Sequence, residues 1–230
     1  MIGRLLLVLW LSSWSALVPA AEWTVVGERG GIDVWTRQLP GAPLKDFRGR
    51  MDVDKPLGMV VAALTDFPAY PQWFLQMREV GVLDSHGLDD VTIYFVIDGV
   101  WPVSDRDAVA QAAVSQDAQT LTIRMMLRAT PRKIPPVAGR VRMPVLQSGW
   151  ELTPLSTTTT RIEVIGSADP GGWVPQWLAN AAVAMLPRKT LERLRRQLEQ
   201  PKYADPEALF AQDPLLHEMR THLRMPGEPP

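Results

Sequence analysis

A series of short strand-like segments is followed, near residue 173, by one long helical pattern, and this order constrains the fold more than any other feature of the chain. Between residues 121 and 128, apolar residues alternate with mostly polar ones, which is the period of a strand with one wet face. The connections between the strands are too short for helical crossovers, so we expect antiparallel neighbours. The predicted strands cover residues 23–26, 32–35, 47–53, 77–83, 92–98, 106–114, 121–129, 148–153 and 161–166. A hairpin is expected between the first two strands, around Gly30 and Gly31.

Two helical patterns are predicted, one early in the chain and one after the last strand. In residues 57–64 apolar side chains recur at helical spacing, with Asp54 as the expected N-cap and Pro56 in the first turn. Residues 70–73 are predicted to form an aromatic loop. The second helix begins near residues 173–175, where proline is tolerated. Its predicted core-facing stripe consists of Leu178, Ala181, Ala182 and Met185 and resumes at Leu191, Leu194 and Leu198.

Pro187 lies inside the second helical pattern and is expected to kink that helix. Strands followed by a helix that packs on one face of their sheet form an α+β fold. Because a sheet of this length curls, a cavity is expected between the sheet and the helix. The sequence therefore predicts a curved antiparallel sheet, closed by a long C-terminal α-helix around an internal cavity.

Residues 1–20 have the pattern of a secretory signal peptide. Arg4 precedes an apolar run over residues 5–11, and residues 18–20 (Val-Pro-Ala) form a small-residue cleavage site. This apolar run is shorter than the roughly 20 apolar residues that a membrane span needs, which favours a cleaved signal peptide. The alternative is that residues 1–20 are retained as a membrane anchor. Cleavage predicts a periplasmic or secreted protein.

After cleavage we expect one domain over residues 21–200, and then a Pro-rich appendage over residues 201–230. One short helix around residues 209–223 is expected to be ordered only if it docks. Without Arg4, 23 basic residues stand against 25 acidic ones, a net charge of −2, which argues against binding to nucleic acid. The chain has no cysteine, so disulfides and thiolate chemistry are excluded. We expect a monomer that is stabilised by its hydrophobic core alone.

The sequence lacks the common motifs of catalysis and metal binding. His86 lies among Asp84, Asp89 and Asp90 in a predicted turn, which we interpret as a solvated loop. There is no glycine-rich phosphate loop after a strand, no His-Glu-x-x-His and no Gly-x-Ser-x-Gly. We therefore predict no catalytic residue, no metal site and no cofactor.

Four segments together resemble a known family. Residues 101–107 read Trp-Pro-Val-Ser-Asp-Arg-Asp, and residues 169–180 read Asp-Pro-Gly-Gly-Trp-Val-Pro-Gln-Trp-Leu-Ala-Asn. Between them lie residues 139–143 (Gly-Arg-Val-Arg-Met) and 149–154 (Gly-Trp-Glu-Leu-Thr-Pro). Taken in chain order, the four segments resemble the START family (steroidogenic acute regulatory protein-related lipid transfer), and the likeness extends over about residues 23–200.

The resemblance implies a helix-grip fold that holds one lipid in an internal tunnel, with the C-terminal helix or neighbouring loops as the gate. It implies a non-catalytic carrier of a phospholipid, a fatty acid or a sterol-like molecule, which contacts a membrane surface transiently. The chain departs from the family in two places. Family members often begin with an extra N-terminal helix, whereas here the expected signal peptide leads almost directly into Trp23. The position six residues beyond the Arg-Asp motif, where sterol-binding members carry an arginine, is Ala112.

The candidate ligand contacts combine apolar side chains with a few amphipathic ones. Arg106 is the candidate for a polar lipid head. Trp73, Trp101, Trp173 and Trp177 are the candidates to line a gate that meets a membrane, because indole is amphipathic; a role as core or loop anchors is the alternative for each. Because neighbouring side chains on a strand point to opposite faces, Arg106 and Asp107 are not expected to enter the cavity together. The predicted lipid-binding residues are Trp73, Tyr94, Trp101, Arg106, Met125, Leu127, Trp177, Asn180, Ala181 and Met185.

Two alternative functions remain at this point. Polyketide cyclases and aromatases are related helix-grip enzymes, and in such a site Asp98, Tyr94 and Arg106 are the candidate acids and bases. The other alternative is a cell-envelope protein that binds another protein through its tail. The mostly aliphatic character of the predicted cavity-facing strands favours the carrier.

Overall fold

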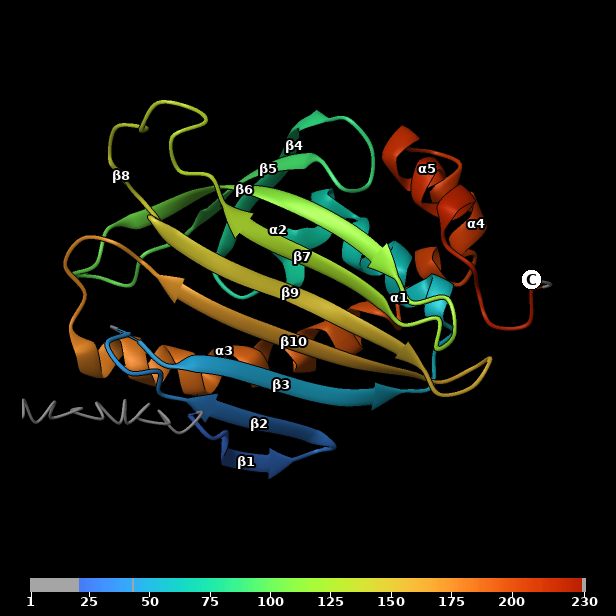
Figure 1. Ribbon diagram of the computed structural model, residues 1–230, viewed down its shortest axis with the longest axis horizontal. Helices are drawn as coiled ribbons and strands as arrows, with labels where there is room; N and C mark the ends of the chain where they lie inside the picture. Colours follow the sequence, from blue (N-terminus) through green and yellow to red (C-terminus); the bar gives the residue numbers. More distant parts are fainter. Residues whose placement is uncertain (1–20, 43, 229–230) are drawn as a thin grey trace, which may run out of the picture.

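The computed structural model describes residues 21–42 and 44–228, so the expected signal peptide lies outside the described residues. The described part forms a ten-stranded sheet in the order β1-β2-β3-β10-β9-β7-β6-β5-β4, with antiparallel neighbours along this path (Figure 1). The remaining strand, β8, pairs with β6 in parallel. The bounds are β1 Thr24–Arg29, β2 Ile32–Arg37, β3 Asp46–Val53, β4 Met77–Ser85, β5 Val91–Ile97, β6 Asp105–Gln116, β7 Ile123–Ala129, β8 Arg140–Arg142, β9 Val145–Pro154 and β10 Thr160–Asp169.

The first two strands are joined by the predicted hairpin at Gly30 and Gly31. Both glycines are in the left-handed region, with φ of +61° and +70°. Two consecutive residues of positive φ are what the tight type I′ hairpin requires, and glycine adopts this conformation without steric cost. The turn pairs Arg29 with Ile32 and sets the register of β1 on β2.

The long helix α3 (Gln176–Gln197) lies behind the sheet in Figure 1 and packs against β2 and β3. It is a single helix that contains Pro187. It approaches the sheet closely at Gly49 of β3, where an added Cβ would lie only 2.9 Å from the Cβ of Pro187. A residue with no side chain at position 49 therefore lets the helix and the sheet come together. The predicted curved sheet, closed by a C-terminal helix, is confirmed.

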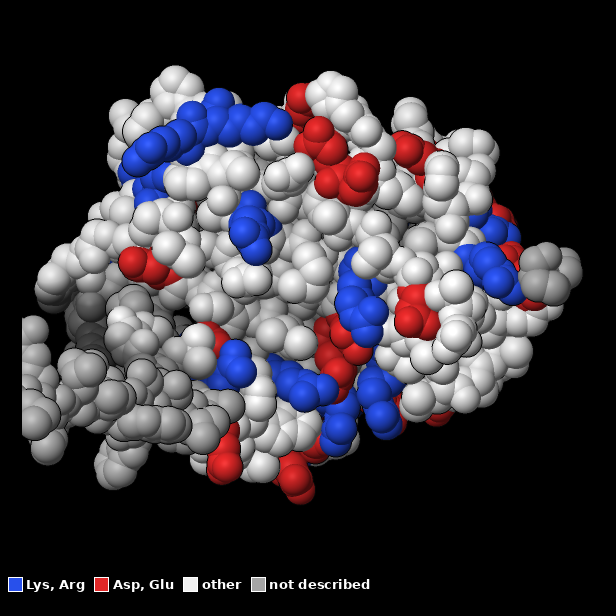
Figure 2. Space-filling model, in the orientation of Figure 1, with Lys and Arg blue, Asp and Glu red and all other residues white. Residues whose placement is uncertain are grey.

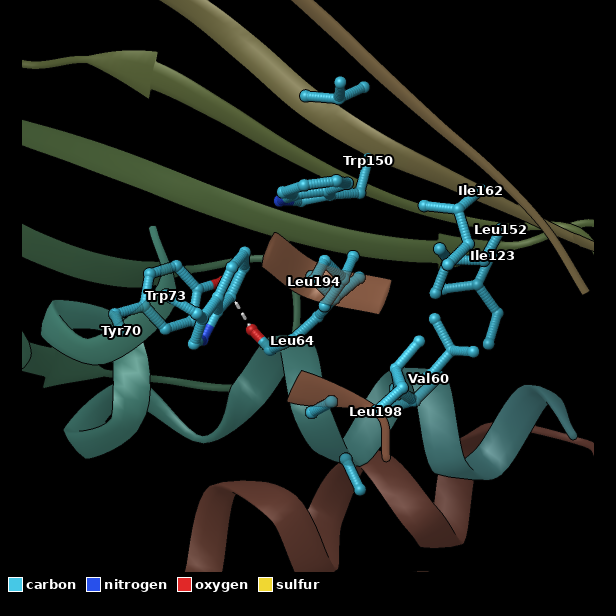
Figure 3. Close-up of a cluster of buried hydrophobic side chains, with 14 of the residues drawn as sticks. Val60, Leu64, Tyr70, Trp73, Ile123, Trp150, Leu152, Ile162, Leu194 and Leu198 are labelled. Atoms are coloured by element: carbon cyan, nitrogen blue, oxygen red, sulfur yellow. Dashed lines mark hydrogen bonds between the residues drawn. The ribbon is translucent and has the colours of Figure 1, made fainter. Parts of the chain in front are cut away.

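The hydrophobic core fills one end of the space between the sheet and α3. There the helix α1 (Leu57–Thr65), the C-terminal half of α3 and the inner face of the sheet meet (Figure 3). Leu191, Leu194 and Leu198 extend from α3 and are almost fully buried. Trp73 and Trp150 belong to this core, with their ring centroids 6.4 Å apart.

The C-terminal segment is folded against the domain rather than detached from it. It comprises η2 (Pro201–Tyr203), α4 (Pro206–Phe210) and α5 (Pro214–His222), of which η2 and α4 contact α1. In Figure 1 these elements lie at the end of the sheet where α1 is found. The buried side chains of this segment are Tyr203, Phe210, Leu216, Met219 and Leu223.

The structure corrects three local predictions. Residues 70–73 are not a loop: they form the short helix α2 (Tyr70–Trp73) after η1 (Phe67–Ala69), and the Tyr70 hydroxyl donates to the carbonyl of Leu64 at 2.6 Å (Figure 3). Asp54 does not cap α1, whose N-cap is Pro56 without a side-chain hydrogen bond. The strand β8 and its parallel pairing were missed, because three residues are too few for a period to show.

The predicted stripe on the closing helix was right at Leu178 and Ala182, which face the space between the helix and the sheet, but wrong at two other positions of its first half. Ala181 and Met185 are exposed, whereas Ala179 and Val183 are buried. The second half of the stripe, Leu191, Leu194 and Leu198, is buried as predicted. Residues 177–186 are apolar at every position except Asn180, so their pattern did not determine which face is buried. Among the described residues, no helix is long and apolar enough to cross a membrane.

Candidate ligand cavity

A cavity of about 320 Å³ lies between the sheet and the N-terminal half of α3, beside the hydrophobic core. This volume is at the lower end of the range for small-molecule sites, about 300–1,000 Å³. The wall is mainly aliphatic and aromatic, and alternate residues of β5 contribute to it, as expected for one face of a strand. Side chains from the sheet and α3 that line it include Ile93, Phe95, Ile97, Leu127, Leu146, Trp150, Val164, Leu178, Ala179, Ala182, Val183 and Leu186.

Three loop segments complete the wall at the end where α3 begins. They are represented by Leu44 before β3, by Val100 and Val103 between β5 and β6, and by Pro170 and Val174 between β10 and α3. The apolar residues of these loops enclose the cavity next to the first turn of the closing helix. We call this end the mouth of the cavity.

The same loops carry indole rings that point away from the protein interior. Trp101 is 90% exposed, Trp173 is 68% exposed, and Trp177 on the first turn of α3 is 73% exposed. Val100, beside Trp101, is also exposed. Large apolar side chains therefore protrude from the segments that form the mouth.

Arg106 is the most buried ionisable side chain on the cavity wall, with 6% of its surface exposed. Its Nη1 donates to the carbonyl of Ser104, and its Nη2 makes long hydrogen bonds to the carbonyls of Gly171 (3.5 Å) and Trp173 (3.3 Å). Burial lowers the pKa of this guanidinium, and the charge of Asp105 acts in the opposite direction. The group stays cationic at neutral pH, because arginine is not deprotonated in proteins.

Asp107 points to the opposite face of β6 and binds a different partner. Its two carboxylate oxygens accept hydrogen bonds of 2.9 Å from Nε and Nη2 of Arg142, and Oδ2 also accepts one of 3.1 Å from the Tyr94 hydroxyl. Arg142 in turn donates to the carbonyls of Pro131, Ile134 and Pro135. This pair therefore anchors the Pro-rich loop on the outer face of the sheet, away from the cavity.

The structure places two of the ten predicted lipid-binding residues, Arg106 and Leu127, on the cavity wall. Trp73 is buried in the adjoining core, and Tyr94 lies on the outer face of the sheet with Asp107. Trp101 and Trp177 protrude into solvent at the mouth. The remaining residues, Met125, Asn180, Ala181 and Met185, lie outside the cavity lining.

Several lining residues were missed by the sequence reasoning. Phe67 and Phe74 line the cavity from either side of residues 70–73, which had been interpreted as a loop, and Ile93, Phe95 and Ile97 do so from β5. The alternation in β5 was a signal for its cavity-facing residues. No comparable signal existed for Phe67 and Phe74, because their position depends on how α2 packs against β4 and α3.

The described residues around the cavity offer few groups for metal binding or acid–base catalysis. Within residues 21–42 and 44–228, no group of three or more His, Asp or Glu side chains is arranged to hold a metal ion. Asp98, a candidate acid on the cavity wall, forms an ion pair of 2.5 Å with Arg78. On the outer surface, positive and negative side chains are mixed over the face seen in Figure 2.

Comparison with known proteins identifies the fold and the family. The family model described as the START domain matches residues 20–202. This chain belongs to the START domain family. It is 32% identical, over 180 residues, to the uncharacterized protein PA1579 of Pseudomonas aeruginosa, covering 78% of this chain and 88% of that protein.

Solved structures agree with this assignment. A crystal structure of a STAR-related lipid transfer protein fragment from Xanthomonas axonopodis is 31% identical and superposes with a TM-score of 0.71, covering 77% of this chain and 99% of that one. Human STARD10 superposes with a TM-score of 0.75 at 20% identity, over 87% of this chain and 82% of that one, which shows the shared fold. The predicted helix-grip fold of the START domain is confirmed.

Proposed function

We propose that this START domain is an exported lipid carrier, which holds one lipid in its internal cavity without catalysing a reaction. The apolar cavity between the sheet and α3 is the observation that carries the proposal. The related fragment from Xanthomonas axonopodis is described as a STAR-related lipid transfer protein, which supports the same function here. Burial of an acyl chain contributes about 0.8 kcal/mol per methylene group, so such a wall needs no covalent chemistry to retain its ligand.

The polar groups near the cavity favour a carrier over a cyclase or aromatase. An enzyme of that class needs an acid or base held within reach of the substrate. Of the three candidates, Tyr94 lies on the far face of the sheet, and Asp98 is paired with Arg78. Arg106 is a cation that neither donates nor accepts a proton readily near neutral pH.

Docking of the C-terminal segment bears on the alternative of a protein-binding tail. Phe210, Leu216 and Met219 are buried against the domain, so these side chains are not free to meet a partner. We therefore assign the segment a structural role beside α1. A monomer and an exported location belong to the proposal as well, the latter supported by the signal-peptide pattern of residues 1–20.

The exposed indoles at the mouth support a transient contact with a membrane. Indole rings favour the interface between water and lipid, because one edge is polar and the ring is apolar. Trp101, Trp173 and Trp177 all extend from the segments that enclose the mouth. A lipid would then leave the bilayer beside the opening of the cavity.

A transfer assay tests this function. Residues 21–230 are mixed with donor vesicles that carry a pyrene-labelled fatty acid or phosphatidylcholine and with unlabelled acceptor vesicles. The proposal expects a transfer rate that rises in proportion to the protein concentration for at least one probe. If the protein neither accelerates transfer nor takes up any of the fatty acid, phospholipid and sterol probes, the carrier function is wrong. Cell fractionation of the full chain tests export separately.

A further inference from the structure

We propose that the cavity selects single-chain lipids with an anionic head group and that Arg106 binds that head group. This inference rests on the proposed function and adds the chemical class of the ligand. It begins with the charge of Arg106, which is buried on the cavity wall. A buried cation is costly unless an anion or several hydrogen bonds compensate it.

The hydrogen bonds of Arg106 are uneven around its guanidinium group. Nη1 is bound to the Ser104 carbonyl, whereas Nη2 makes only the two long bonds, of 3.3 and 3.5 Å, to loop carbonyls. Nε is buried and has no hydrogen-bond partner among the described residues. Nε and Nη2 form the edge of the guanidinium that binds a carboxylate or a phosphate with two parallel hydrogen bonds. This edge of Arg106 therefore has only two long hydrogen bonds, both from Nη2.

Arg142 shows what the same edge does when an anion is present. Its Nε and Nη2 hold the carboxylate of Asp107 with two hydrogen bonds of 2.9 Å. Arg142 and Arg106 are both largely buried, but only Arg142 has a carboxylate within ion-pair distance in the described part of the chain. Of these two buried arginines, Arg106 is therefore the one whose charge no carboxylate of the described residues compensates through an ion pair.

The acidic residues closest to Arg106 along the chain are already engaged. Asp105 accepts a hydrogen bond of 2.9 Å from the backbone N–H of Gly99 and forms an ion pair of 2.8 Å with Arg78. Asp98, on the cavity wall, pairs with the same Arg78. These contacts direct both carboxylates to Arg78, which leaves Arg106 as a cation available to an anion inside the cavity.

The position of Arg106 also fits the polar end of a lipid. The carbonyls that it contacts belong to residues 104, 171 and 173, in the loops that form the mouth. From there the wall continues along β9 from Leu146 to Trp150, four residue steps that span about 13 Å of strand. With its head group bound to Arg106, the lipid would place its acyl chain along this apolar wall. The volume of about 320 Å³ favours one chain over two.

Two probes that differ only in their head group test the inference at pH 8. Palmitate is anionic, and 1-hexadecanol has the same chain length but no charge. Hydrogen bonds to a buried charge predict that the wild-type protein binds palmitate at least about tenfold more tightly than hexadecanol. A second matched pair, 1-palmitoyl lysophosphatidate and monopalmitoylglycerol, tells whether a phosphate is accepted in place of the carboxylate.

The variant Arg106→Met keeps much of the side-chain length but removes the charge. We expect this variant to bind palmitate no more tightly than hexadecanol. Its affinity for hexadecanol should stay within about threefold of the wild-type affinity. Arg128→Met, at an exposed site on β7, serves as the matched control and should leave the preference unchanged. Retained hexadecanol binding shows that the variant is folded.

The possible outcomes distinguish a failure of this inference from a failure of the proposed carrier function. Equal affinity of the wild type for both members of each pair overturns the anionic preference and leaves the carrier function intact. A preference that survives in Arg106→Met likewise overturns the role of Arg106. If neither member of any pair binds to the wild type, the single-chain class is overturned, and the carrier function fails with it only if the phospholipid and sterol probes of the transfer assay are not taken up either. Since the wild-type comparison needs no variant, an unfolded Arg106→Met does not obscure the result.

Discussion

Arg142 on β8 clamps Asp107 on β6 with two hydrogen bonds of 2.9 Å, although the two residues are 35 positions apart. Both side chains are largely buried, and Arg142 also binds three carbonyls of the Pro-rich loop. The pair joins the short parallel strand β8, this loop and the centre of the sheet. It therefore stabilises the outer side of the wall that encloses the cavity.

Replacing one member of this pair is expected to destabilise the domain. In Asp107→Asn the charge of Arg142 is left buried without its counterion, which predicts a loss of about 3 kcal/mol in the free energy of unfolding. The measurement is equilibrium unfolding in urea. The control is Asp52→Asn, which breaks the exposed pair with Arg161 and is expected to cost less than about 1 kcal/mol. Equal losses in the two variants would contradict the structural importance of the buried pair.

The same pair predicts a dependence of stability on pH. Burial opposes ionisation of Asp107, but the hydrogen bonds and charge of Arg142, aided by Tyr94 and Arg140, outweigh it and lower the pKa of this carboxyl. Because the folded pKa lies below the unfolded one, the stabilisation is fully present above about pH 4 and is lost as the pH falls through the folded value.

This contribution is measured as the difference in unfolding free energy between the wild type and Asp107→Asn. We expect the difference to shrink as the pH is lowered from about 6 toward 2, since protonation removes from the wild type the charge that the variant lacks. A difference that stays constant over this window would show that Asp107 is not held ionised by Arg142.

The exposed indoles are expected to matter for membrane contact and not for folding. In the triple variant Trp101→Ala, Trp173→Ala and Trp177→Ala, sedimentation with phosphatidylcholine vesicles should fall several-fold, because the rings that favour the interface are removed. The melting temperature should change little, as these side chains are exposed. Val25→Ser, at another exposed apolar site, is the control. Unchanged sedimentation of the triple variant would refute a role for the mouth in membrane binding.

The docked C-terminal segment is expected to stabilise the domain through Phe210. This ring is 2% exposed and lies next to Gly58 of α1, so Phe210→Ala should cost about 3–5 kcal/mol of unfolding free energy. Leu155→Ala removes an exposed apolar side chain instead and should be nearly neutral. A small effect of Phe210→Ala in urea unfolding would mean that the segment does not contribute to the core.

The sequence predicted the features that follow from local periodicity. Alternation in the strands and the helical spacing of Leu191, Leu194 and Leu198 were sufficient for the antiparallel sheet and its closing helix. The glycine pair at residues 30 and 31 predicted the first hairpin for a steric reason. These features depend on neighbours within a few positions of one another, so one sequence is enough to find them.

The cavity residues were harder to predict, because a cavity depends on which faces meet in three dimensions. The first half of α3 is apolar on almost every side, so Ala181 and Ala182 were both assigned inward, although only Ala182 lines the cavity and Ala181 is exposed. Tyr94 was assigned to the site, but its strand presents Ile93 and Phe95 to the cavity. Arg106 was selected correctly as a lining residue, whereas its unpaired edge is visible only in the folded structure.

Native mass spectrometry of two neighbouring variants tests the carrier function most directly. Ala182→Phe places a ring in the cavity, whereas Ala181→Phe adds the same ring to the exposed side of α3. Residues 21–230 are purified from the cell envelope, and bound molecules are identified after lipid extraction. We predict one lipid per chain in the wild type and in Ala181→Phe, and little or none in Ala182→Phe. A wild-type protein that is empty, or a lipid that stays bound at the same stoichiometry in Ala182→Phe, would contradict a ligand held in this cavity.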